Sequence, residues 1–232
     1  MISPLDRIVL PQGALINRKV PLPGGGFEQV GQDDGRLNAM DLFFRMNRGR
    51  FTMSVVADLG SNCGHYPFLF RELGAIRVMA MEGRDQFSDV YQSLAARMPN
   101  LGEGIDWHRG DIRDLLAEIR KPCDVDIVSM LGLIYHVEKP WDFLSRVSET
   151  FAAAHTLCIE GEIGGETEDV TTIEGGPTGD QSKALRAGEE CLKPSALSME
   201  DNLIRLGWVP TRIPLPTQLY IGGARGFWIC VR

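Results

Sequence analysis

The sequence predicts an α/β fold in which a mostly parallel sheet of seven strands carries helices on both faces. Short apolar runs suited to buried strands alternate along residues 53–162 with segments whose apolar residues recur at helical spacing. A glycine-punctuated turn follows the first of these strands, which is typical of nucleotide-binding α/β units. The composition, with 44% hydrophobic and 24% charged residues, is close to the average of globular proteins.

The individual elements follow from the spacing of apolar residues. The first strand carries Val55, Val56 and Leu59, a run suited to a strand buried on both faces. The other predicted strands cover residues 76–82, 105–108, 125–130, 155–162, 208–213 and 227–231. Helical spacing predicts helices over residues 36–48, 66–73, 85–98 and 141–151, one after residue 111, and one beginning at residue 195.

The turn after the first strand has the pattern D-x-G-x-x-x-G, formed by Asp58, Gly60 and Gly64. A dinucleotide site would need G-x-G-x-x-G, and Asp58 would repel a pyrophosphate. The first glycine lets the chain reverse, and we expect the second to let the backbone approach a ligand closely. A cationic ligand therefore fits this turn better than a nicotinamide dinucleotide.

This turn resembles motif I of the class I S-adenosylmethionine-dependent methyltransferases. Gly110-Asp111-Ile112 resembles their third motif, and the segment from Leu131 to His136 resembles their fourth. Asn62-Cys63-Gly64 together with Tyr135-His136 is similar to the subgroup that contains the tRNA wobble-uridine carboxymethyltransferases and many small-molecule methyltransferases. The resemblance implies a Rossmann-like sheet with an antiparallel C-terminal hairpin, and S-adenosylmethionine as a cofactor that is released as S-adenosylhomocysteine.

Acidic residues at successive strand ends are the expected cofactor contacts. Glu82 ends the second strand. It lies near the position, roughly 20 residues after the end of the first strand, at which a carboxylate binds ribose hydroxyls in nucleotide-binding units. The resemblance implies that Asp111 accepts from the adenine amino group, although Asp111 also fits as a helix N-cap. The full set of expected cofactor-binding residues is Asp58, Gly60, Ser61, Asn62, Gly64, Glu82, Gly83, Gly110, Asp111, Ile112 and Leu131.

His136 and Tyr135 are the expected catalytic residues. Imidazole titrates near neutral pH, so His136 is the candidate base, with a positioning role as the alternative. Tyr135 would line the methyl site or bind the acceptor. Glu160 and Glu162 are further candidates to activate a nucleophile or bind a cation, but no required metal is predicted, because residues 131–134 are wholly apolar.

We make one further prediction each for His65 and Arg186. His65, inside the motif turn, is expected to face solvent rather than the methionine end of the cofactor. A carboxylated cofactor would need a basic partner, for which Arg186 is the plausible counterpart.

One methyltransferase domain is expected over residues 1–232. Residues 1–50 form an N-terminal arm and helix, 51–162 the cofactor-binding core, 163–193 a lid insertion, and 194–232 a C-terminal helix and hairpin. A passive surface loop is the alternative for the glycine-rich insertion.

Charge and cysteine content bound the function. The net charge of -7 argues against a broad nucleic-acid-binding face. Five scattered cysteines indicate reduced thiols and a cytoplasmic protein, and no membrane span is expected. The predicted function is methyl transfer to an oxygen or nitrogen of a small molecule. The alternatives are a tRNA wobble-uridine methyl- or carboxymethyltransferase and a non-catalytic partner protein of the same fold, and a homodimer is left open.

Overall fold

Every strand expected from the sequence is present in the computed structural model. The strands are β3 (Val55–Leu59), β4 (Arg77–Glu82), β5 (Ile105–Arg109), β6 (Ile127–Leu131), β7 (Thr156–Ile163), β10 (Val209–Arg212) and β11 (Ala224–Val231). They belong to one seven-stranded sheet in the order β10-β11-β7-β6-β3-β4-β5. β4 pairs in parallel with β3 and with β5, β6 pairs in parallel with β7, and β11 is antiparallel to both β7 and β10. The predicted Rossmann-like sheet with antiparallel C-terminal strands is confirmed.

The structure describes residues 18–21, 27–30, 36–96, 99–119, 123–173, 190–215 and 224–232. The chain divides into two compact units, Met1–Gly110 and Asp111–Arg232, and each is described by itself. A single domain over the whole chain stays an expectation. Within the described residues, no helix has the length and apolar character needed to cross a membrane.

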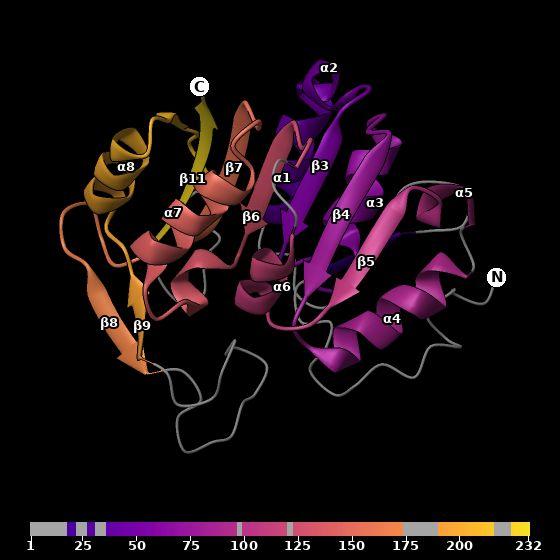
Figure 1. Cartoon of the computed structure of the whole chain (residues 1–232), viewed down its shortest axis with the longest axis horizontal. Helices are drawn as coiled ribbons and strands as arrows, with labels where there is room; N and C mark the ends of the chain where they lie inside the picture. Colours follow the sequence, from indigo (N-terminus) through magenta and orange to yellow (C-terminus); the bar gives the residue numbers. More distant parts are fainter. Residues whose placement is uncertain are drawn as a thin grey trace. The chain divides into compact units, whose positions relative to one another are not determined.

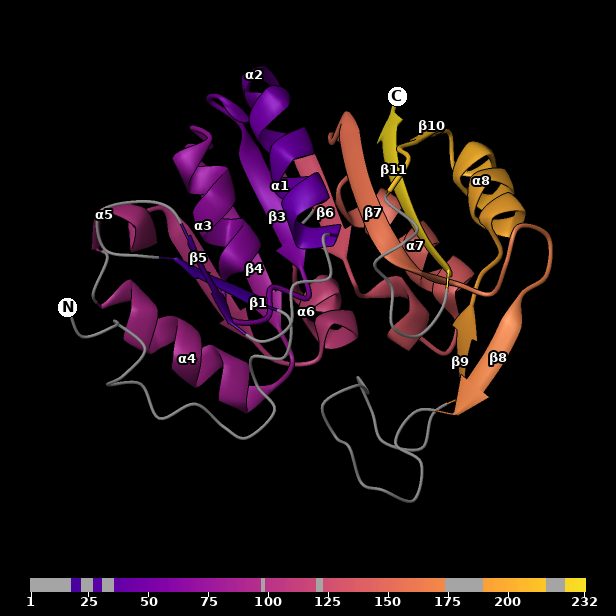
Figure 2. The same cartoon turned by 180° about the vertical axis from the view of Figure 1, so that it is seen from behind.

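The first unit packs its helices on β3, β4 and β5 through an aromatic core. The helices are α1 (Arg36–Met46), α2 (Arg48–Phe51), α3 (His65–Glu72), α4 (Asp85–Ala95) and α5 (Pro99–Gly102), and β1 (Arg18–Pro21) pairs with β2 (Phe27–Val30). Figure 2 shows α1 and α3 in front of β3 and β4. The ring of Phe44 lies 5.6 Å from that of Phe51 and 5.5 Å from that of Phe70, between centroids. These contacts fasten α1 and α2 to α3.

The second unit covers β6 and β7 with α7 (Pro140–Thr150), which lies in front of them in Figure 1. Its other helical elements are α6 (Ile112–Glu118), the short 3-10 helix η2 (Ile134–His136) and α8 (Ala196–Arg205). The apolar residues that predicted α7, among them Leu144 and Val147, are buried. Trp208 donates from Nε1 to Ser148 Oγ at 2.9 Å, which ties the start of β10 to α7.

The insertion after β7 contains a hairpin that the sequence did not indicate. β8 (Val170–Ile173) pairs antiparallel with β9 (Glu190–Lys193), and residues 174–189 lie outside the described part of the chain. Asp169 accepts from the backbone N–H of Ser195 at 2.6 Å, and Gly164 donates to the carbonyl of Pro194 at 3.0 Å. The base of the expected lid is therefore attached to the start of α8.

Candidate active site

The motif turn after β3 is held against the end of β4. The backbone N–H groups of Gly60 and Ser61 both donate to the carbonyl of Met81, each at 2.9 Å. Ser61 Oγ donates to the carbonyl of Asp58 at 2.9 Å and accepts from the N–H of Met81 at 3.1 Å. The hydroxyl of Ser61, an expected cofactor contact, is thus engaged in fixing the turn.

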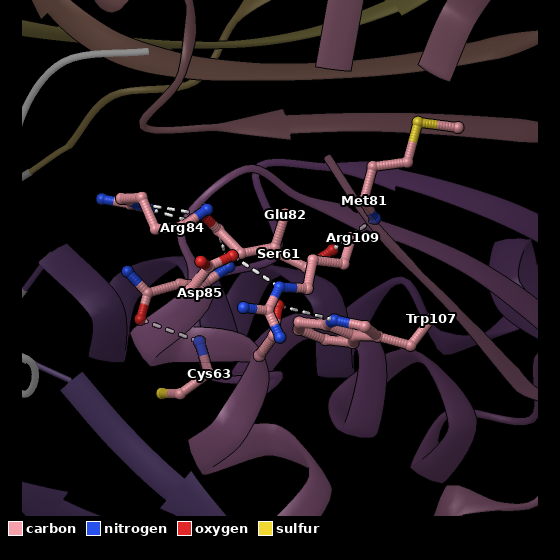
Figure 3. A network of polar contacts seen from close by, with 10 residues as sticks. Ser61, Cys63, Met81, Glu82, Arg84, Asp85, Trp107 and Arg109 are labelled. Atoms are coloured by element: carbon pink, nitrogen blue, oxygen red, sulfur yellow. Dashed lines mark hydrogen bonds and ion pairs between the residues drawn. The ribbon is translucent and has the colours of Figure 1, made fainter. Parts of the chain in front are cut away.

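Glu82, at the carboxyl end of β4, accepts hydrogen bonds from the turn and from Arg84 (Figure 3). Its side chain is 2% exposed. Oε2 accepts from the backbone N–H of Asn62 at 2.8 Å, and Oε1 accepts from the backbone N–H of Arg84 at 2.9 Å. The guanidinium of Arg84 donates to the same two oxygens, from Nε at 2.8 Å and from Nη2 at 3.1 Å. These four donors match the roughly four lone-pair positions of a carboxylate.

A ligand that hydrogen-bonds to Glu82 must consequently replace some of these donors. The N–H groups of Asn62 and Arg84 are fixed by the backbone, whereas the Arg84 side chain is 28% exposed. Its Cζ lies 4.2 Å from the centroid of the Phe87 ring, on which it can rest. The sequence indicated Glu82 but not Arg84. The signal that could have identified Arg84 is a basic residue two positions after the acid.

Asn62 and Gly64 give the turn its left-handed backbone. Asn62 has a φ of 52°, and its Oδ1 accepts from the N–H of Cys63 at 2.8 Å. Gly64 has a φ of 95°, and a Cβ built there would lie 2.8 Å from Cδ2 of Tyr91 and 3.1 Å from Cε2 of Phe68. The structure therefore gives Gly64 a reason other than the expected approach of a ligand: aromatic side chains of α3 and α4 occupy the space.

The expectation that His65 faces solvent is wrong. His65 is buried, and its Nε2 lies 2.9 Å from Oδ1 of Asp41, a buried residue of α1. The contact joins α1 to the first residue of α3, directly after the motif turn. Sequence reasoning missed it because the two residues come from separate helices.

The remaining cofactor candidates of the first unit are two glycines after strand ends and the acid Asp58. Gly83 is exposed after β4, and the N–H of Gly110 donates to the carbonyl of Glu82 at 3.1 Å. Asp58 is buried at the end of β3. The structure thus brings Asp58, the turn and Glu82 into one local arrangement.

In the second unit, Asp111 is the N-cap of α6, as the sequence allowed. Its Oδ1 accepts from the N–H of Arg113 at 3.0 Å, and the Arg113 guanidinium donates to both oxygens at 3.0 and 2.8 Å. Ile112 is buried beside it, and Leu131 at the end of β6 is half-buried. The contact between Asp111 and adenine stays a prediction.

Tyr135 and His136 lie in η2, which follows β6. Their rings are 4.1 Å apart between centroids and tilted by 44°. The Tyr135 hydroxyl oxygen accepts from Nη2 of Arg225 at 3.3 Å, and the Arg225 Cζ lies 5.2 Å from the centroid of the Tyr135 ring. Arg225, on β11, is a site residue that sequence reasoning missed.

Glu160 and Glu162, the two acids of β7, are both paired with cations. Arg225 donates to Glu160 from Nε at 2.5 Å and to Glu162 from Nη1 at 3.2 Å, and Lys193 Nζ lies 2.6 Å from Glu162. Burial lowers the pKa of the Arg225 guanidinium, but the charge of Glu160 and the contacts with Tyr135 raise it by more, so this pKa lies well above its usual range. In this structure both acids therefore form ion pairs with the cations Arg225 and Lys193.

Within the described residues, no group of three or more histidine, cysteine, aspartate or glutamate side chains is arranged to hold a metal ion. Arg186 lies outside the described residues.

The chain is similar to solved structures that include methyltransferases. No family model and no curated protein matches the chain. The N-terminal domain of EvdMO1, solved with S-adenosylhomocysteine, is 16% identical with a TM-score of 0.69, over 94% of this chain and 91% of that one. The 1,6-didemethyltoxoflavin-N1-methyltransferase of Burkholderia thailandensis, solved with 1,6-didemethyltoxoflavin and S-adenosylhomocysteine, is 16% identical with a TM-score of 0.61, over 86% of this chain and 79% of that one.

A third similar structure is magnesium protoporphyrin IX methyltransferase (ChlM) from Synechocystis PCC 6803, solved with S-adenosylhomocysteine. It is 17% identical with a TM-score of 0.61, over 89% of this chain and 90% of that one. At such identities the likeness establishes the fold. The chain has the Rossmann-like fold of the class I methyltransferases.

Proposed function

We propose that this protein is an S-adenosylmethionine-dependent methyltransferase that methylates an oxygen or nitrogen of a small molecule and releases S-adenosylhomocysteine. The observation that carries the proposal is the buried carboxylate of Glu82, fixed against the motif turn at the carboxyl end of β4. The fold, and the S-adenosylhomocysteine bound in similar methyltransferase structures, support it.

The residues of the motif turn fit the cofactor chemically. Glu82 presents two acceptor oxygens, which suit the adjacent hydroxyl groups of a ribose once the Arg84 guanidinium moves aside. The resemblance assigns Asp58 to the methionine amino group and Asp111 to the adenine amino group, and Gly60, Gly83, Gly110 and Leu131 are further proposed cofactor-binding residues. When bound, the cofactor supplies a methyl group that is already activated by the positive charge on sulfur.

The protein then has two tasks, to align the acceptor and to remove its proton. Alignment of reacting groups can contribute roughly 7 to 11 kcal/mol to lowering the barrier. Tyr135 and His136 are proposed for these tasks because η2 holds their rings together after β6. His136 would take the proton, an assistance typically worth about 10² to 10⁴ in rate.

A small molecule is the proposed acceptor, and the cytoplasm the proposed compartment. The formal net charge of -7 disfavours RNA, whose phosphates are bound by clustered cations. Arg84, beside Glu82, and Arg225, beside Tyr135, are both paired with glutamates. They are therefore poor candidates for phosphate contacts.

The test is calorimetric titration of the purified chain with S-adenosylhomocysteine. We expect micromolar binding by the wild type and at least tenfold weaker binding by Glu82→Gln and Asp58→Asn, which keep the size of the side chains. Glu72→Gln is the matched control, because Glu72 lies at the end of α3 and pairs with Arg45, away from the turn. No binding by a folded wild-type protein would overturn the proposal, as would equal losses in all three variants.

A further inference from the structure

Arg225 is a buried cation that has no role in the methyl transfer as proposed above. The side chain is 9% exposed and reaches Glu160, Glu162 and Tyr135. The pairing of β11 with β7 sets it opposite Glu162 and diagonal to Glu160, on the same face of the sheet. Buried ion pairs are weak evidence for stability, since apolar residues of similar volume often serve as well. Stability is therefore a weak explanation for this cluster of Arg225 with Glu160, Glu162 and Tyr135, and we consider a functional role.

The hydrogen bond between Arg225 and Tyr135 has a fixed direction. A guanidinium can only donate, so the Tyr135 oxygen accepts from Nη2 of Arg225. The hydrogen of the Tyr135 hydroxyl is then directed at another acceptor, and within the described residues this hydroxyl donates no hydrogen bond. Because Tyr135 is only half-buried, that acceptor is either water or a bound molecule with a lone pair that takes the place of the water.

The ring of Tyr135 is held in one position. A Cβ on Gly161 would lie 2.9 Å from Cδ1 of Tyr135 and 3.1 Å from Cγ2 of Ile134, so only glycine leaves room for the ring at this point of β7. The Arg225 guanidinium lies over the ring as well, 5.2 Å from its centroid. The hydroxyl is therefore presented by a rigid support, as a binding contact requires.

The same cluster extends to the hairpin of the insertion. Lys193 of β9 lies 2.6 Å from Glu162, Glu162 lies 3.2 Å from Arg225, and Arg225 lies 3.3 Å from the Tyr135 hydroxyl. These contacts form a continuous series of charged and polar groups from β9 to η2. A change at the hairpin can reach Tyr135 through it.

We propose that Arg225 is a positioning residue that aims the hydroxyl hydrogen of Tyr135 at a lone pair of the methyl acceptor, and that Lys193 couples the insertion hairpin to this contact. The inference rests on the proposed function. It defines the acceptor as a molecule that carries a hydrogen-bond-accepting oxygen or nitrogen where Tyr135 meets it.

The test uses the protein labelled with 3-fluorotyrosine. The chain has four tyrosines, so fluorine NMR gives four signals, and Tyr135→Phe assigns one of them. We expect Arg225→Met to move the Tyr135 signal more than any other, Lys193→Met to move it less, and Arg225→Lys to keep it near the wild-type position. Arg212→Met is the matched control, because Arg212 lies on the neighbouring strand β10 and pairs with Glu166.

Two further readouts separate this proposal from the proposed function. Binding of S-adenosylhomocysteine should stay within about twofold of wild type in Arg225→Met and Lys193→Met, whereas failure of the wild type to bind would contradict the proposed function. For an acceptor found by screening with radiolabelled S-adenosylmethionine, Arg225→Met should lower kcat/KM at least tenfold, with partial recovery in Arg225→Lys.

Two results would overturn the role of Arg225. One is an unmoved Tyr135 signal in both Arg225→Met and Lys193→Met. The other is an equal movement in Arg212→Met. Should Arg225→Met fail to fold, Lys193→Met and Arg225→Lys decide the outcome, since Lys193 is more exposed than Arg225.

Discussion

Replacing Arg84 with methionine should strengthen the binding of S-adenosylhomocysteine, if Glu82 binds the ribose as proposed. The wild-type guanidinium occupies one acceptor position on each oxygen of Glu82, at 2.8 and 3.1 Å. Ribose hydroxyls need those positions, so binding must displace the arginine side chain. Methionine keeps the packing on Phe87 but has no hydrogen to donate.

The expected gain follows from the two hydrogen bonds exchanged. The ribose hydroxyls would donate to the charged Glu82 carboxylate as the guanidinium does, so the exchange loses mainly the attraction between the two opposite charges. For two unit charges close together at a protein surface this attraction is on the order of 1 to 4 kcal/mol, and we place it low in this range because Arg84 is 28% exposed. A cost of about 1.4 kcal/mol corresponds to a tenfold lower Kd in Arg84→Met.

Calorimetric titration with S-adenosylhomocysteine measures the Kd directly, at a temperature well below the unfolding temperature of the variant. Arg109→Met is the control, because Arg109 lies opposite Glu82 on β5 and pairs with Asp85, so the change in net charge is the same. Binding that is weaker in Arg84→Met than in Arg109→Met would refute the reasoning, since Arg84 would then assist the ligand rather than compete with it.

Three other changes test the structure. Gly64→Ala should lower the free energy of unfolding by about 1 to 3 kcal/mol in a denaturant titration, because φ is 95° and Tyr91 occupies the added methyl's position. Asp111→Ala should cost about 1 kcal/mol through loss of the α6 cap, while Asp111→Asn should retain most of it. Burial, with a smaller effect of the Asp106 charge, raises the pKa of Tyr91 from 10.0 to about 12. The unfolded chain therefore releases this proton first, so stability should fall as pH rises from about 10 to 12, and Tyr91→Phe should remove that part of the fall.

The fold was predictable because its determinants are local. A buried parallel strand reads as a short apolar run, and a helix as a 3.6-residue repeat, so β3, β4 and α7 could be located without knowledge of their partners. The position of Glu82 followed in the same way, since an acid at the end of a strand beside a glycine turn needs only local sequence. The hairpin of β8 and β9 was missed because its two strands of four residues are separated by residues 174–189.

The partners of the site residues were not predictable, because they depend on packing between distant segments. Arg225 meets Glu160 across 65 residues, through the register of β11 on β7. His65 meets Asp41 across 24 residues, through the packing of α1 on α3. Arg84 lies only two residues from Glu82, but the sequence does not determine whether its side chain faces this acid or the solvent.

The two arginines differ in a way that leads to a last prediction. Arg84 is partly exposed and pairs with Glu82, so a ligand can displace it, whereas Arg225 is buried against Glu160, Glu162 and Tyr135 and should stay in place. Arg84 contacts Glu82 and Phe87, whereas Arg225 contacts Glu160, Glu162 and Tyr135. Effects at sites without shared partners usually add within about 0.3 to 0.5 kcal/mol. The double variant Arg84→Met, Arg225→Lys should thus bind S-adenosylhomocysteine as tightly as Arg84→Met alone. A Kd tenfold different from that of the single variant would mean that cofactor binding and the Tyr135 cluster are coupled.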